Sequence, residues 1–241
     1  MKKYIIALIV MVLTLSACSN DEKKKAVTIK DKLTKDKQIA YVYDTKSKDI
    51  KKSDKVQQIL SIDDGKAKPY MIENASLTLD ELTKKDDKEI LKIAKKADKK
   101  AFESEKESQL ESEKLLSVIE KDKKKKADKK DRVTEIENAE YSKPKAIQLK
   151  FSAPIKDSKD SKEIVLTPDP YNPYASMKLE RNKDYERTNK SFPMIFSDEL
   201  ESTKINGERY SGLQDDVGDK NRNVVVQLKD NESKITFDKA E

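Results

Sequence analysis

The chain has 241 residues, of which 41% are charged, and it contains no histidine, no tryptophan and a single cysteine. Without histidine it cannot form a Ser-His-Asp or Cys-His nucleophile or a histidine-ligated zinc site. A single cysteine excludes an intramolecular disulfide and a thiolate metal cage. These absences remove several common classes of enzyme and metal site from consideration.

Basic and acidic residues are nearly balanced. Lys and Arg number 52 against 46 Asp and Glu, which gives a formal charge of +6. Most of the basic residues are lysines, whereas arginine carries the planar group preferred for phosphate and base recognition. Because the two signs are interspersed, the composition favours a soluble surface over a nucleic-acid footprint, and we expect no nucleic-acid partner.

The first residues have the pattern of a secretory leader. Met1-Lys2-Lys3 is followed by an uninterrupted apolar run from Tyr4 to Leu13. At 1.5 Å per residue this run is shorter than the roughly 30 Å hydrocarbon core of a bilayer. It therefore predicts a signal peptide over residues 1–17 rather than a membrane span.

The leader ends in Leu15-Ser16-Ala17-Cys18. This tetrapeptide resembles the lipobox of bacterial lipoproteins, which implies diacylglycerol on the Cys18 sulfur and signal-peptidase cleavage between Ala17 and Cys18. Two acyl chains would hold the protein at the extracytoplasmic face of the cell membrane. In composition the remaining chain is similar to uncharacterised surface lipoproteins of Gram-positive bacteria. The alternative is an ordinary leader with a cysteine present by chance.

Residues 18–37 are polar, rich in lysine and free of aromatic side chains. Such a segment buries too little apolar area to offset its ordering entropy. We therefore predict a flexible, lipid-anchored tether over this range. Its lysines are also suited to contact with anionic lipid head groups.

Residues 38–132 are predicted to form an α+β region. Alternating apolar residues predict a strand from Gln38, and further strands are expected at 56–62 and 66–72. Asp63-Asp64-Gly65 between the last two is typical of a hairpin turn, because glycine tolerates a positive φ. Pro69 cannot donate to a sheet ladder and therefore favours an edge position for the third strand.

A long helix rich in lysine and glutamate is expected after these strands. Thr78 and Glu81 match a capping box, and Asp86 offers a second helix start. From Ile90 the apolar residues follow helical spacing, which fades past 102 and returns between 110 and 119.

Residues 121–130 contain seven lysines and two aspartates. One interpretation is a solvated, fraying helix end and linker, which suits the negative end of the helix dipole. The other is a docking surface for an acidic partner, either a lipid surface or the anionic polymers of a Gram-positive wall. Both interpretations stay open from the sequence.

Residues 133–241 are predicted to form a β-rich domain. Long helical periodicity disappears from residue 141, and short alternating runs recur at intervals typical of a sandwich or small barrel. The segment 230–233 suits a short hairpin between the last two strands. The candidate strands are 146–152, 163–167, 175–180, 192–197, 203–210, 223–229 and 234–238.

Two segments of this region resemble binding sites. Asp219, Asn221, Asn223 and Asp230 follow the spacing of a calcium loop, but Val224 stands where that loop needs glycine, so a polar β-turn is preferred. Tyr171-Asn172-Pro173-Tyr174 predicts a stiff loop that either binds a partner or covers the edge of a sheet.

The sequence as a whole predicts the α+β fold class, with a small N-terminal strand region and a long charged helix followed by an all-β, sandwich-like C-terminal domain. We expect a lipoprotein anchored through Cys18 that acts as a non-catalytic binding module at the cell envelope. An envelope protein or an anionic wall polymer is the expected partner. No catalytic, cofactor-binding or metal-ligating residue is expected.

Three other functions stay open. The chain could be a structural or assembly component of the envelope. It could be a hydrolase of wall polymers that uses paired carboxylates, although 46 acidic residues make such pairs unspecific. The cleaved leader could also act as a pheromone-like signal.

Overall fold

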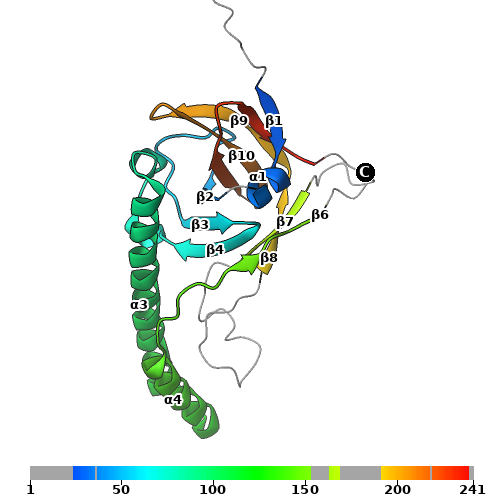
Figure 1. Cartoon of the computed structure of the whole chain (residues 1–241). Helices are drawn as coiled ribbons and strands as arrows, with labels where there is room; N and C mark the ends of the chain where they lie inside the picture. The colour runs from blue at the N-terminus through cyan, green and yellow to red at the C-terminus, as the bar shows by residue number, and fades with distance from the viewer. Residues whose placement is uncertain (1–23, 36, 153–162, 169–190, 218, 239–241) are drawn as a thin grey trace, which may run out of the picture.

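The computed structural model describes residues 24–35, 37–152, 163–168, 191–217 and 219–238 (Figure 1). Ala17, Cys18 and the tyrosine loop at 171–174 lie outside these residues, as does the expected strand at 175–180. The described part contains one large sheet, two small sheets and a long pair of helices.

Seven antiparallel strands form the large sheet, in the order β5-β4-β3-β2-β11-β10-β9. They are β2 (Gln38–Thr45), β3 (Gln58–Asp63), β4 (Lys66–Met71), β5 (Ile147–Gln148), β9 (Asp198–Ile205), β10 (Glu208–Val217) and β11 (Lys220–Gln227). At the centre β2 pairs with β3 on one side and with β11 on the other, where Tyr41 lies opposite Val225. Strands from both sides of the expected boundary at 132/133 therefore share one sheet.

Two smaller sheets accompany it. β6 (Lys150–Ser152), β7 (Glu163–Pro168) and β8 (Ser191–Phe196) form an antiparallel sheet of three strands. β1 (Lys25–Thr28) pairs in parallel with β12 (Glu232–Thr236), so the two ends of the described chain lie side by side.

Both faces of the large sheet are covered. Side chains of β2 alternate between two hydrophobic clusters, so that Tyr41 joins one cluster and Val42 the other. The cluster that contains Tyr41 packs against α2 (Leu79–Leu82) and the start of α3 (Asp87–Ile119). The cluster that contains Val42 packs against α1 (Ile29–Lys35) and β12. β2 and β11 are consequently buried from both sides, as the central strands of a three-layer arrangement.

The α+β class expected from the sequence is confirmed. The chain has a small N-terminal strand region, a long helix and antiparallel strands in its C-terminal part. A short 3₁₀ helix, η1 (Glu73–Ala75), follows β4, and α4 (Lys123–Asn138) follows α3.

Local turn and cap predictions are confirmed. Asp64 and Gly65 have φ values of 49° and 67° in the turn between β3 and β4. Thr78 and Glu81 form a reciprocal capping box, and the Asp86 side chain accepts a hydrogen bond from the Glu89 N–H at the start of α3.

The predicted tether is wrong for residues 25–35, which form β1 and α1. Ile29 and Leu33 lie one helical turn apart and are 0% and 1% exposed in the cluster beneath the sheet. The high lysine content of the segment obscured this i, i+4 apolar pair, which is enough to dock a short helix.

Two strand predictions also need correction. The expected strand at 203–210 is interrupted by a turn at Asn206 and Gly207, where both residues have positive φ, and it divides between β9 and β10. The expected hairpin at 230–233 does not form, because β12 leaves β11 and pairs with β1 instead.

Replacing Leu33 with alanine tests the docking of α1. We expect the Leu33→Ala variant to lose about 2–5 kcal/mol of unfolding free energy, because the substitution leaves a cavity in a fully buried site. Urea titration followed by circular dichroism measures the loss. Lys30→Ala on the exposed side of α1 is the matched control and should change stability by less than about 0.5 kcal/mol. Equal, small effects of both variants would mean that the segment is a tether after all.

Candidate functional site

The two long helices form an antiparallel hairpin. α3 spans 33 residues, and α4 begins after a three-residue connection. The Asp122 side chain caps α4 by accepting hydrogen bonds from the Lys124 and Lys125 N–H groups at 2.9 and 3.0 Å. These bonds hold the pKa of Asp122 below its usual value. The lysine-rich stretch at 121–130 therefore begins a helix and is not the linker that one interpretation expected.

Polar contacts hold α4 on one face of α3. Glu113 is buried between the helices and lies 3.5 Å from Lys129 and 3.4 Å from Arg132. The Lys106 ammonium donates hydrogen bonds of 2.8 Å to the carbonyl oxygens of Glu137 and Ala139, which satisfies the C-terminal end of α4.

A buried carboxylate fixes the hairpin to the edge of the sheet. One Asp98 oxygen accepts a hydrogen bond from the Met71 N–H at 2.9 Å, and the other accepts one from the Tyr141 hydroxyl at 2.7 Å. The Phe102 and Tyr141 rings pack edge to face, with their centroids 5.8 Å apart. Beyond this junction the end of α3 and the turn to α4 extend past β3 and β4 (Figure 1).

Three apolar side chains lie exposed at the projecting end. Leu115, Val118 and Ile119 are 63%, 72% and 60% exposed, and they are the large hydrophobic residues that the described chain leaves open to solvent. Their i, i+3, i+4 spacing places them on one face of the last turns of α3. Isolated exposed hydrophobics are common, but a contiguous group marks an interaction surface. We call these three residues the apolar tip.

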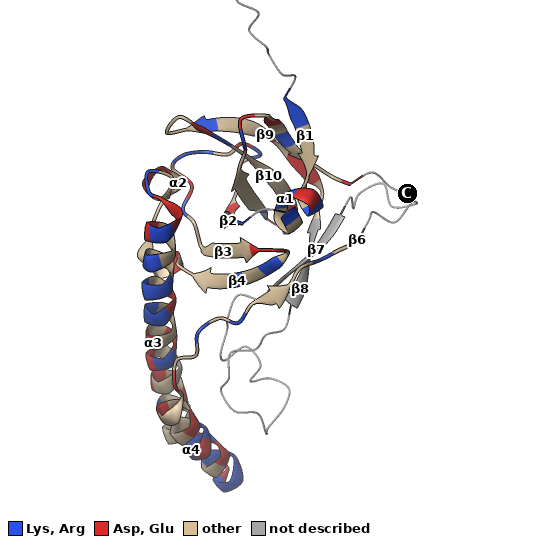
Figure 2. Ribbon diagram, viewed as in Figure 1, with Lys and Arg blue, Asp and Glu red and all other residues tan. Residues whose placement is uncertain are grey.

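A second feature of α3 is a row of lysines on its outer face (Figure 2). The row consists of Lys92, Lys95, Lys96, Lys99 and Lys100, which together with Glu103 line an open hollow of about 600 Å³. Lys99 and Glu103 form an ion pair at 3.7 Å. The other four lysines form no ion pair with a described carboxylate. We call these five residues the α3 lysine row.

The α3 lysine row is unfavourable for the helix that carries it. Lys92 and Lys96, Lys95 and Lys99, and Lys96 and Lys100 are all pairs of like charge at i, i+4. Each such pair destabilises a helix by roughly 0.2–0.5 kcal/mol, whereas glutamate at one position would stabilise it by a similar amount. The arrangement is therefore not explained by helix stability.

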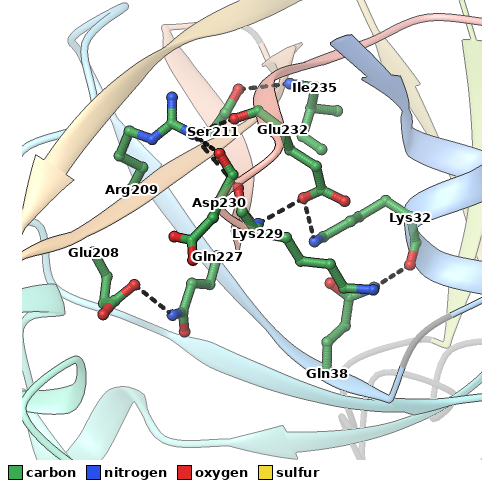
Figure 3. Close-up of polar contacts among 10 residues, drawn as sticks. All are labelled: Lys32, Gln38, Glu208, Arg209, Ser211, Gln227, Lys229, Asp230, Glu232 and Ile235. Carbon is green, nitrogen blue, oxygen red and sulfur yellow. Dashed lines mark hydrogen bonds and ion pairs between the residues drawn. The ribbon is translucent and has the colours of Figure 1, made fainter. Parts of the chain in front are cut away.

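A buried ion pair joins the two ends of the described chain (Figure 3). Lys32 of α1 is 3% exposed, and its Nζ lies 2.6 Å from a Glu232 carboxylate oxygen. The same oxygen accepts a hydrogen bond from the Lys229 N–H at 2.8 Å. Arg209 donates to the carbonyl oxygens of Asp230 and Glu232. These contacts turn the chain away from β11, which explains why the expected hairpin is absent.

The calcium-like spacing does not bring its oxygens together. Asn221 and Asn223 lie within β11, while Asp230 lies beyond the other end of that strand. The Asn223 amide oxygen accepts a hydrogen bond from Gln214 at 2.9 Å inside the sheet. Within the described ranges, no cluster of three or more metal-ligating side chains was found.

Buried tyrosines do not offer a base. Burial raises the pKa of Tyr210 to about 12, and it raises the pKa values of Tyr41 and Tyr43 as well. A phenol whose pKa is raised stays neutral near pH 7. All three side chains lie in the hydrophobic cluster against α2 and α3.

Comparison with protein-family models, with curated proteins and with solved structures gave no match. Among the helices that the structure describes, none combines the length and apolar character needed to cross a membrane. The site is therefore defined by the geometry of the hairpin alone.

The exposed residues of the hairpin are only partly predictable from the sequence. The sequence predicts that helical apolar spacing returns between 110 and 119, but α4 covers the face of α3 that carries Lys106 and Glu113 and leaves Leu115 and Ile119 exposed. The signal for the α3 lysine row is the repeat of lysines at i, i+4 without an intervening glutamate, which is readable in the sequence but does not by itself show which face of the helix is open.

The buried ion pair can be tested by a double-mutant series. Lys32→Met should cost about 3–5 kcal/mol of unfolding free energy, because it leaves the Glu232 carboxylate buried without its cation. Adding Glu232→Gln should recover part of this loss, since glutamine is neutral and keeps an oxygen for the Lys229 N–H. Urea unfolding of both variants measures the difference. A cost below about 1 kcal/mol for Lys32→Met would show that the pair is solvated.

Proposed function

We propose that this protein is a lipid-anchored extracytoplasmic lipoprotein that acts as a non-catalytic binding module at the cell envelope, and that the apolar tip contacts its partner. The observation that carries this proposal is the gathering of three exposed apolar side chains at the projecting end of the hairpin. Protein interfaces concentrate their binding energy in a few central apolar residues surrounded by polar ones. The apolar tip, followed at once by the charged start of α4, has this composition.

The construction of the hairpin supports a binding role. Asp98 fixes the base of the exposed segment to β4, and Glu113 with Lys129 holds the two helices together. A surface that is rigid before binding loses less conformational entropy when a partner docks. The apolar tip is thus held in place by contacts that do not use its own side chains.

The predicted anchor would place the hairpin away from the bilayer. If Cys18 carries the acyl chains, residues 19–24 separate it from β1, and six extended residues span at most about 20–22 Å. The β1 end of the fold would then stay close to the membrane. In Figure 1 the turn between α3 and α4 lies at the end of the molecule opposite β1, so it would be presented to other envelope components.

The anchor is tested with a Cys18→Ala variant. We expect the wild-type protein in the membrane fraction with a diacylglycerol adduct on Cys18, and the variant without the adduct and with its leader uncleaved. Mass spectrometry of the N-terminal peptide after fractionation measures both. Ser19→Ala is the matched control and should be processed like the wild type. A free thiol and an intact leader in wild-type cells would contradict the anchor.

The apolar tip is tested by replacing its three side chains with glutamine. The Leu115→Gln, Val118→Gln, Ile119→Gln variant should lose capture of its envelope partner, because it loses apolar contact area but keeps good helix formers. Pull-down from solubilised envelope with quantitative mass spectrometry compares it with the wild type. The control variant is Ser104→Gln, Ser108→Gln, Ser112→Gln on the same helix. Identical capture by both variants would show that the tip is not the binding surface.

A further inference from the structure

We propose that the α3 lysine row binds a linear polyanion, a polymer whose phosphate or carboxylate groups repeat along its chain. The inference deepens the proposed binding function, and it rests on that function only for the location of the polymer in the cell envelope. Binding itself requires neither the lipid anchor nor the apolar tip.

The first argument is the density of uncompensated charge. The five lysines of the row lie between Lys92 and Lys100, which are about 12 Å apart along the helix axis. Together with Glu103 they line one side of an open, solvent-exposed surface region of about 600 Å³. Since Glu103 pairs only with Lys99 in this row, most of the positive charge faces solvent. A short run of anionic units could contact several ammonium groups at once.

The second argument is the repulsion between these lysines. Like charges at i, i+4 oppose each other on the free helix. An anion that lies between Lys92, Lys96 and Lys100 replaces this repulsion with attraction. Removing the charges should therefore weaken polymer binding and leave the fold as stable as before or more stable. Two effects of opposite direction are not expected for residues that serve only the fold.

The third argument concerns the kind of polyanion. Helices that bind a membrane surface combine lysines with a free apolar face that enters the bilayer. Along the part of α3 that carries the row, the apolar face is already used, because Ile90, Ala94 and Phe102 are buried against the rest of the protein. The row also lacks arginine and aromatic side chains, which nucleic-acid sites use for base contacts and stacking. Lysine point charges on a rigid helix suit a linear polymer best.

The experiment measures binding of fluorescent polyphosphate and poly-L-glutamate to the chain from residue 19 onward at low ionic strength. This chain keeps both hydrophobic clusters, whose residues lie between 27 and 237. The test variant is Lys92→Gln, Lys96→Gln, Lys100→Gln. The control variant is Lys46→Gln, Lys66→Gln, Lys68→Gln, which removes three exposed charges elsewhere.

We expect the wild type and the control variant to bind at least one polymer, and the test variant to bind about tenfold more weakly or worse. The slope of log Kd against the logarithm of the salt concentration should fall by about one for each lysine contact removed. The thermal midpoint of the test variant should equal or exceed that of the wild type. Preference between the two polymers identifies phosphate or carboxylate as the recognised group.

Several outcomes would overturn the inference. Two of them are binding of neither polymer by the wild type and equally tight binding by the test variant and the wild type. Loss of binding only in a Lys123→Gln, Lys124→Gln, Lys125→Gln variant would assign the polymer to α4. Binding to phosphatidylglycerol vesicles but not to the polymers would assign the row to a lipid surface. None of these outcomes depends on the state of Cys18, so they are separable from failure of the proposed anchor.

Discussion

The pairing of β2 with β11 is the interaction on which the remaining structure depends. It joins strands that lie far apart along the chain, with Val42 opposite Val224, and it is buried on both faces. Once these strands pair, one face of the sheet must be covered by α1 and β12 and the other by α2 and α3, because both faces are apolar. The Lys32–Glu232 ion pair then fixes α1 to β12 beneath the sheet.

The same constraint explains the shape of the hairpin. The first turns of α3 use their apolar residues to cover the sheet, and Asp98 ends that contact with hydrogen bonds to β4 and Tyr141. Past this point the helix continues without a sheet beneath it. There α4 packs against α3 through its buried Ile136 and through the ion pair between Lys129 and Glu113. It covers only one face of α3, so the apolar residues on another face of α3 stay exposed.

Local signals in the sequence were sufficient for the caps and for one turn. The Thr78–Glu81 box and the Asp64-Gly65 turn depend on residues within four positions of each other, so they are readable without the fold. The Asn206-Gly207 turn is equally readable, because an Asn-Gly pair is a typical two-residue hairpin turn. The docking of α1 and the parallel pairing of β12 depend on partners about 200 residues away, which local patterns do not encode. For the same reason the exposure of the apolar tip could not be inferred until α4 was placed.

The buried carboxylates and the exposed lysines of α3 differ in how their charges are compensated. Buried carboxylates at 98, 113 and 232 each meet donors that were described above, as expected where an unpaired charge is costly. The α3 lysine row shows the opposite arrangement, since like charges repeat at helical spacing on a surface where glutamate would improve stability. A sequence that satisfies its buried charges so thoroughly, yet leaves this repulsion on its longest helix, indicates a requirement other than folding. Recognition of an anionic partner is a requirement that such an arrangement meets.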